Sequence, residues 1–84
     1  MSSIPSRSFD VRVNESEGKL LLVRGLDAYE LDDVEATIWA ACDGEHTVDQ
    51  VVDVVVETYD VDRPTAERDV AEFLGQLRDA SLLE

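Results

Sequence analysis

The sequence predicts an α+β domain of winged-helix type, in which an N-terminal three-stranded antiparallel sheet is followed by three helices. Three observations lead to this fold class. Short apolar stretches separated by glycine-containing turns occupy residues 9–31, apolar side chains recur at steps of three and four from residue 32 onward, and the strands all precede the helices. The 84 residues are enough for one small core and one domain.

The first predicted strand begins near Phe9, where Phe9, Val11 and Val13 alternate with polar residues as in a half-buried strand. A turn over residues 15–18 leads to residues 19–24, whose continuous apolar centre predicts a middle strand buried on both faces. Residues 26–31 then form the third strand, with Tyr29 and Leu31 on the same face. As an edge strand, it leaves a row of backbone groups without partners.

The first helix begins after Asp32, which can accept a hydrogen bond from the amide of Glu35 in an acidic capping box. It ends before Asp43-Gly44, where Gly44 is expected to take a left-handed conformation that closes the helix. Thr47 and Gln50 form a second capping box that opens the next helix. The inward side chains predicted for these two helices are Val34, Ala36, Ile38, Trp39 and Cys42, then Val48, Val51, Val52, Val55, Val56 and Tyr59.

Pro64 is predicted as the first residue of the third helix, which ends near residues 80–81. Its apolar positions at helical spacing are Ala66, Val70, Phe73, Leu74 and Leu77. Leu82 and Leu83 are expected to fold back onto the core. Residues 1–8 are polar and show no period, so the sequence predicts a flexible N-terminal arm before a domain over residues 9–84.

The charge balance argues against several classes of partner. Seven lysines and arginines stand against twenty acidic residues, for a formal net charge of −13. Nucleic acids and anionic membranes both require clustered cations, so neither is expected as a partner. The acid excess is typical of a well-solvated surface, and it can also attract a basic partner.

Residues 1–84 contain one cysteine and no apolar run long enough to span a membrane. One cysteine allows no internal disulfide and no multi-thiolate metal site, which favours a cytoplasmic protein with a buried structural Cys42. His46 is the only histidine and no glycine-rich phosphate loop is present, so neither a catalytic site nor a cofactor is predicted. The third helix carries too little positive charge for DNA; its charged residues include Glu67, Asp69, Glu72 and Asp79 against Arg68 and Arg78.

Several short motifs in fixed order resemble the PqqD-like family. They are an aliphatic-Trp pair shortly before Cys-Asp-Gly (residues 38–44), a Thr-Val helix start (47–48), an acidic-Val pair before Phe-Leu (69–74), and a leucine-rich end. Each motif alone is weak, but their order and spacing over residues 9–84 are fairly specific.

The resemblance implies a recognition element for ribosomally synthesised and post-translationally modified peptides, which binds the leader region of a precursor and presents it to modifying enzymes. In this family the leader adds a strand to the third strand and packs against the third helix. Carried over by position, the strand contacts are Leu26, Ala28, Tyr29, Glu30 and Leu31. The helix contacts are Val70, Phe73, Leu74 and Leu77, rimmed by Glu67 and Arg78.

The residues leave alternatives open. The four apolar helix positions can equally be core, Tyr29 can be a peptide anchor or a sheet residue, and Glu30 and Glu67 can be surface charges. The resemblance implies partner enzymes of either a lasso peptide pathway, namely a leader peptidase and a cyclase, or a radical S-adenosylmethionine enzyme. A protein adaptor without leader binding and a winged-helix regulator are the other functional classes. The open edge allows a monomer or an edge-strand dimer.

Overall fold

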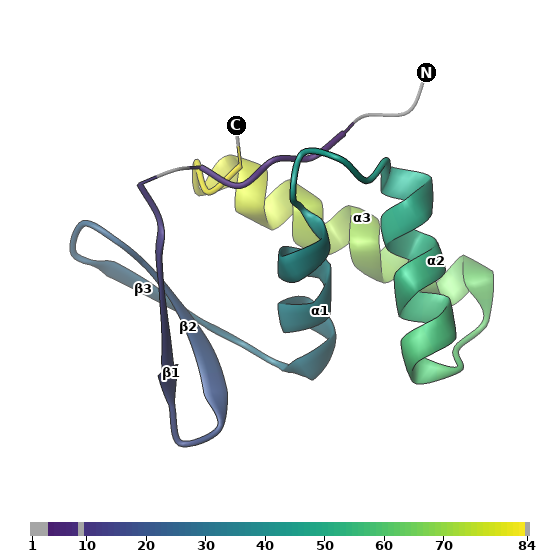
Figure 1. The fold of residues 1–84 in the computed structure, drawn as a ribbon, viewed down its shortest axis with the longest axis horizontal. Coiled ribbons are helices and arrows are strands. Elements are labelled where there is room, and N and C mark those ends of the chain that lie inside the picture. The colour runs from purple at the N-terminus through teal and green to yellow at the C-terminus, as the bar shows by residue number, and fades with distance from the viewer. Residues whose placement is uncertain (1–3, 9, 84) are drawn as a thin grey trace.

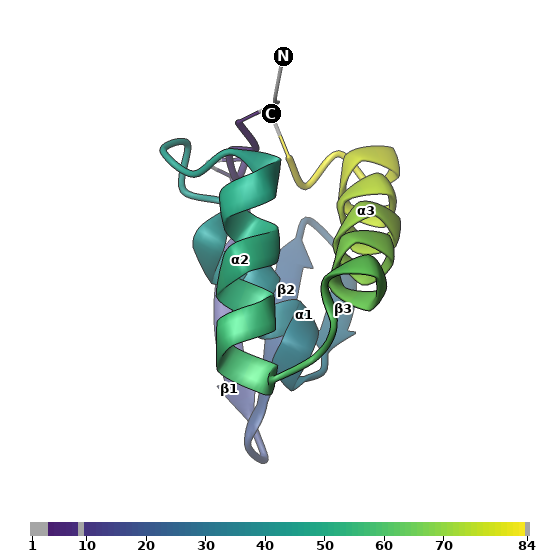
Figure 2. The same ribbon diagram turned by 90° about the vertical axis from the view of Figure 1, so that its right-hand side faces the viewer.

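A computed structural model describes residues 4–8 and 10–83 of the chain. It has a three-stranded antiparallel sheet of order β1-β2-β3 followed by three helices, as predicted (Figure 1). The elements are β1 (Arg12–Ser16), β2 (Lys19–Arg24), β3 (Asp27–Leu31), α1 (Asp33–Ala41), α2 (Val48–Tyr59) and α3 (Arg63–Asp79). The sheet lies to one side of the helices, and α2 and α3 stand side by side (Figure 2). The sequence analysis predicted Pro64 as the first residue of α3, but α3 begins at Arg63 and Pro64 is its second residue.

Two tight turns fix the register of the sheet. Glu17 and Gly18 both have positive φ angles, 53° and 79°, as a type I′ hairpin requires. Gly25 has a φ of 61° at the first position of the second turn, the conformation that glycine supplies in type II′ hairpins. Leu26, predicted as a strand residue, is the other residue of this turn and is fully exposed.

Burial of the sheet differs from the prediction in β1 and β2. All five residues of β1 are exposed, so the prediction that Val13 lies on a buried face was wrong. Val11 precedes β1, is partly buried and packs against the core, and Phe9 lies outside the described residues. In β2 only Leu22 is fully buried, so this strand is not covered on both faces. The reason is the connection between sheet and helices. Because α1 follows β3 directly and packs against it, β3 lies beside the helices, next to α3 in Figure 2, and β1 is the opposite edge of the sheet.

The core is formed by the three helices and the inner face of the sheet. Its fully buried large side chains include Leu22, Ile38, Val51, Val52, Val55, Val70, Cys42 and Leu82. Trp39 is also buried, as predicted, and the Arg7 guanidinium lies 6.0 Å from the centre of its ring. Burial raises the pKa of the Cys42 thiol to about 11, which fits the structural thiol expected from the sequence.

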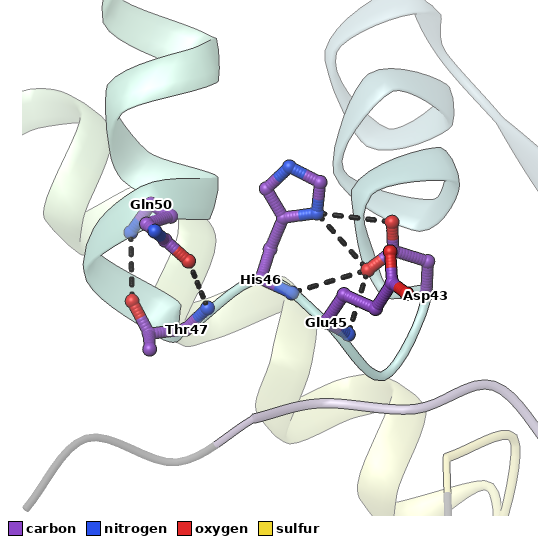
Figure 3. Close-up of polar contacts among 5 residues, drawn as sticks. All are labelled: Asp43, Glu45, His46, Thr47 and Gln50. Carbon is purple, nitrogen blue, oxygen red and sulfur yellow. Dashed lines mark hydrogen bonds and ion pairs between the residues drawn. The ribbon is translucent and has the colours of Figure 1, made fainter.

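The corner between α1 and α2 is held by side-chain hydrogen bonds (Figure 3). The Thr47 hydroxyl accepts from the Gln50 amide at 3.2 Å, and the Gln50 side chain accepts from the Thr47 amide at 2.8 Å, which confirms the predicted capping box. An Asp43 oxygen accepts from the amides of Glu45 and His46, and the His46 Nδ1 lies 3.0 Å from both carboxylate oxygens. The corner is thus organised by Asp43.

Gly44 has the positive φ expected of it, 80°, but it does not close α1. Its amide donates to the carbonyl of Pro5 at 3.0 Å, while the end of α1 is closed by the Cys42 amide donating to the Trp39 carbonyl at 3.1 Å. The predicted role of Gly44 as a helix cap was therefore wrong, because the N-terminal segment takes the glycine amide instead.

The Asp43 carboxylate should make the fold sensitive to acid. The hydrogen bond with the His46 side chain, then those from backbone amides, lower the pKa of Asp43 from its ordinary value to about 2. A carboxylate whose pKa is lower in the folded state stabilises the fold above about pH 4, and this stabilisation is lost as pH falls toward 2. The difference between wild type and Asp43→Asn in the urea concentration at the midpoint of unfolding should therefore become smaller as the pH falls from about 4 toward 2. His46→Ala should reduce the same pH dependence, and an unchanged gap from pH 5 to 2 would contradict the assignment.

The described part of the predicted flexible arm is hydrogen-bonded to the domain. The amide of Arg7 donates to the Cys42 carbonyl at 3.2 Å, and the amide of Ser8 donates to the Leu82 carbonyl at 2.9 Å. Residue 7 also forms a β-bridge with Leu83, so residues 5–8 run between the helical corner and the C-terminal segment. Leu82 is buried and Leu83 packs against the core, as predicted.

Candidate functional site

The outer edge of β3 is open within the described chain, because β3 pairs only with β2. The two-residue turn makes Arg24 and Asp27 a hydrogen-bonded pair, and such pairs alternate along an antiparallel ladder. Tyr29 therefore directs its amide and carbonyl toward β2. Ala28 and Glu30 direct theirs away from it, where an added strand would find two donors and two acceptors.

A cleft runs beside this edge, between β3 and α3. It has a volume of about 430 Å³. We call it the β3–α3 cleft; it is lined by Ala28, Tyr29, Glu30, Leu31, Glu35, Phe73, Gln76, Leu77, Ala80 and Leu82. Leu31, Phe73, Leu77 and Leu82 are also core residues, so the cleft exposes the edge of the core to an incoming side chain.

A second hollow adjoins the cleft and shares Glu35, Phe73 and Gln76 with it. We call it the acidic pocket; it has a volume of about 300 Å³ and is lined by Asp32, Val34, Glu35, Ile38, Asp69, Glu72, Phe73 and Gln76. Asp32 and Glu35 form the capping box of α1, at 2.8 and 3.0 Å, which fixes both carboxylates at the base of this helix. The pocket thus combines three apolar lining residues with four carboxylates.

Glu30 stands at the mouth of the cleft and pairs with Lys19 of β2, whose Nζ lies 2.7 Å from its carboxylate. The hydrogen bond to Glu30 raises the pKa of Lys19. Both side chains are more than half exposed, so the pair contributes little to stability. Its effect is to hold the Glu30 side chain toward β2 at the open edge.

The structure brings together about half of the site residues predicted from the sequence. Six of them line the β3–α3 cleft: Ala28, Tyr29, Glu30, Leu31, Phe73 and Leu77. Val70 and Leu74 are buried in the core instead. Glu67 is exposed and lies 3.5 Å from Arg63, and Arg78 is exposed near the end of α3. Leu26 lies in the turn before β3. Leader contacts of all the predicted site residues, those in the cleft included, stay predictions.

Sequence reasoning missed four lining residues of the cleft, namely Glu35, Gln76, Ala80 and Leu82. Glu35 had been identified as a capping residue and Leu82 as a residue that folds back, so both were noticed for another role. Gln76 follows Phe73 by three residues on the same helix face, a spacing that could have pointed to it. Within the described residues, no group of three or more His, Cys, Asp or Glu side chains could hold a metal ion.

The model of one protein family, "Coenzyme PQQ synthesis protein D (PqqD)", matches residues 17–83. The chain belongs to the PqqD family. A curated relative from Methylorubrum extorquens, the bifunctional coenzyme PQQ synthesis protein C/D, is 30% identical over 78 residues, or 93% of this chain. The chain spans about a fifth of that relative, 21% of its length.

Three solved structures share the fold. TbiB1 in complex with the TbiA(beta) leader peptide is 31% identical, with a TM-score of 0.82 over 94% of each chain. The PqqD truncation of Methylobacterium extorquens PqqCD, described as a functional stand-alone recognition element, is 29% identical, with a TM-score of 0.79 over 95% of this chain and 87% of that one. Lasso peptide synthetase B1 bound to its leader peptide is 21% identical, with a TM-score of 0.84 over 98% and 99%, and shows the fold alone. None of the helices in the described part of this chain has the length and apolar character needed to cross a membrane.

Proposed function

We propose that this protein binds the leader region of a ribosomally synthesised precursor peptide and presents the peptide to modifying enzymes. The leader adds a strand to the open edge of β3, where Ala28 and Glu30 offer their backbone groups. Its alternate side chains enter the β3–α3 cleft against Phe73 and Leu77. The protein acts by recognition and not by catalysis.

The observation that carries this proposal is the position of an apolar cleft directly beside an unpaired strand edge. Strand addition draws affinity from main-chain hydrogen bonds, and neighbouring pockets for side chains supply specificity. Neither feature alone would distinguish a peptide site from an ordinary sheet edge or a gap in packing. This chain is 31% identical to TbiB1, whose structure was solved with a leader peptide, and that similarity supports the same kind of ligand.

We further propose a lasso peptide pathway, in which a leader peptidase and a cyclase act on the bound precursor. The similarity to TbiB1, at 31% identity, supports recognition of a leader peptide and does not distinguish between pathways. The alternative is a pathway with a radical S-adenosylmethionine enzyme. The similarity to PqqD relatives supports this alternative, so the experiments below test both pathways. The leader site is the same in both pathways.

An NMR titration tests the proposal. The ¹⁵N-labelled protein is titrated with synthetic leader peptides from precursor genes encoded beside its own gene. We expect amide shifts concentrated on residues 27–31 and on the cleft-facing side of α3, because these groups gain hydrogen bonds or contacts. A scrambled peptide of the same composition is the control and should leave these amides in place.

The same titration separates the leader proposal from a protein adaptor. If no neighbouring leader shifts β3, but an enzyme from the same gene cluster shifts amides on the helices, leader binding is contradicted and an adaptor function is supported. Shifts on β3 from a leader of a lasso precursor, and not from one of a radical-enzyme precursor, would assign the pathway.

A further inference from the structure

Strand addition to β3 gives the acidic pocket no role, although it opens from the same cleft. Its apolar lining residues are Val34, Ile38 and Phe73, and four of its other lining residues are carboxylates. A purely apolar side chain would bring no partner to the carboxylates, and an acidic one would be repelled. A lysine or arginine side chain fits both parts, because its methylene stem covers apolar surface while its charged head stays among polar groups.

We infer that the acidic pocket receives a lysine or arginine side chain of the leader peptide, and that this contact selects among leaders. The inference rests on the proposed function, since the peptide lies in the β3–α3 cleft and enters the pocket from there. Glu35, Phe73 and Gln76 line both hollows, so the path between them is continuous. The stem lies on the partly exposed Val34, and the cation faces Glu72 and Asp69 of α3.

The carboxylates of the pocket differ in the hydrogen bonds and ion pairs that they already form. Asp32 and Glu35 accept backbone amides in the capping box of α1. Asp69 has only a loose partner, with the Arg68 Nε at 3.8 Å from its oxygen. Glu72 has no hydrogen bond or ion pair with any described residue, and no lysine or arginine is among the described residues that line the pocket. Glu72 is therefore the carboxylate most available to an incoming cation.

Charge also decides between the possible occupants of the open edge. A second copy of this chain would bring another formal charge of −13 to a site already rimmed by carboxylates. Like charges at an interface oppose association, whereas a cationic segment is attracted toward such a site over some distance. A peptide that carries a basic residue is thus favoured over edge-to-edge pairing of two copies.

A double-mutant cycle tests the inference, with the leader peptide that shifts β3 amides as the probe. Glu72→Gln keeps the size of the side chain and removes its charge, and each basic residue of the leader is replaced in turn by norleucine. We expect Glu72→Gln to weaken binding about threefold, as for a partly exposed ion pair. At one leader position, the peptide with norleucine should bind the wild-type protein and Glu72→Gln equally, because it no longer carries the cation that Glu72 would contact. Glu57→Gln, on the exposed side of α2, is the matched control and should leave the affinity unchanged.

Each outcome bears on a distinct statement. Coupling between Glu72 and one basic position, reduced in high salt, would support the inference. A leader that shifts β3 amides but has no basic residue, or none coupled to Glu72, would overturn the inference and leave the proposed function intact. If no leader shifts β3 amides, the proposed function and the inference are both contradicted.

Discussion

Ala28→Pro should weaken leader binding about tenfold or more while the domain stays folded. The proline removes the backbone donor that Ala28 directs to the open edge, and its ring occupies the space where the added strand would lie. One lost hydrogen bond together with this steric conflict accounts for an effect of that size. The ladder between β2 and β3 is spared, because Ala28 belongs to a pair that exchanges no hydrogen bonds with β2. Affinity is measured by calorimetry with the leader peptide, and Glu30→Pro should behave in the same way.

The matched control is Val13→Pro in β1. Val13 lies opposite Leu22 in a pair without hydrogen bonds, so its amide also faces away from the sheet, but at the far edge. Both proline variants should lose similar stability, and only the variant in β3 should lose affinity. Equal loss of affinity in the two variants would contradict the assignment of the site to the edge of β3.

Trp39→Ala should lower the free energy of unfolding by about 3–5 kcal/mol, the range typical of large aromatic truncations in cores. Trp39 is only 3% exposed and lies beside Ile38 in the helix that opens the corner, so the cavity would form at the centre of the packing. Because small domains have total stabilities of about 5–15 kcal/mol, this one change should remove much of the stability.

Urea unfolding followed by far-UV circular dichroism measures the effect, since the variant lacks the only tryptophan for fluorescence. Leu26→Ala is the control, because it also truncates a large apolar side chain but at a fully exposed turn, where changes of about 0.5 kcal/mol or less are usual. The loss in Trp39→Ala should also exceed that in Ala28→Pro. A loss in Trp39→Ala below about 1 kcal/mol would show that Trp39 is not a core residue.

The helical half of the fold was predictable because its signals are local. Thr47 and Gln50 lie three residues apart, so the start of α2 depended on a few neighbouring residues, and its end at Tyr59 followed from the periodic valines. The same holds for Asp32 and Glu35 at the start of α1. These contacts would form in any chain that places those residues in a helix, whatever packs around it.

Burial of the sheet was less predictable because it depends on contacts distant in sequence. The alternation through Val13 reads as a strand with one buried face, yet whether anything covers that face depends on where the helices lie. Here α1 continues from β3, and β1 is left exposed. The apolar run of residues 19–24 likewise predicted correctly that β2 is the middle strand. The prediction that β2 is buried on both faces was wrong.

The same limit applies to the site. Val70, Phe73, Leu74 and Leu77 share one helical period, and periodicity alone cannot divide them between core and cleft. The structure makes that division, because only Phe73 and Leu77 face the gap beside β3 as well as the core. Contacts of Glu67 and Arg78 with a leader stay predictions, since they came from the resemblance and not from a local physical signal.

The pairing of the N-terminal segment with the C-terminal one has a consequence for the order of folding. The Ser8 hydroxyl donates to the carbonyl of Ser81, 73 residues later, and Arg7 forms its bridge with Leu83. Closing so long a loop is entropically unfavourable until the intervening chain is compact. During synthesis Arg7 and Ser8 therefore lack these C-terminal partners until residues 81–83 have been made. We expect pairing of the two segments to be a late step in folding, after which hydrogen bonds join the two ends of the domain.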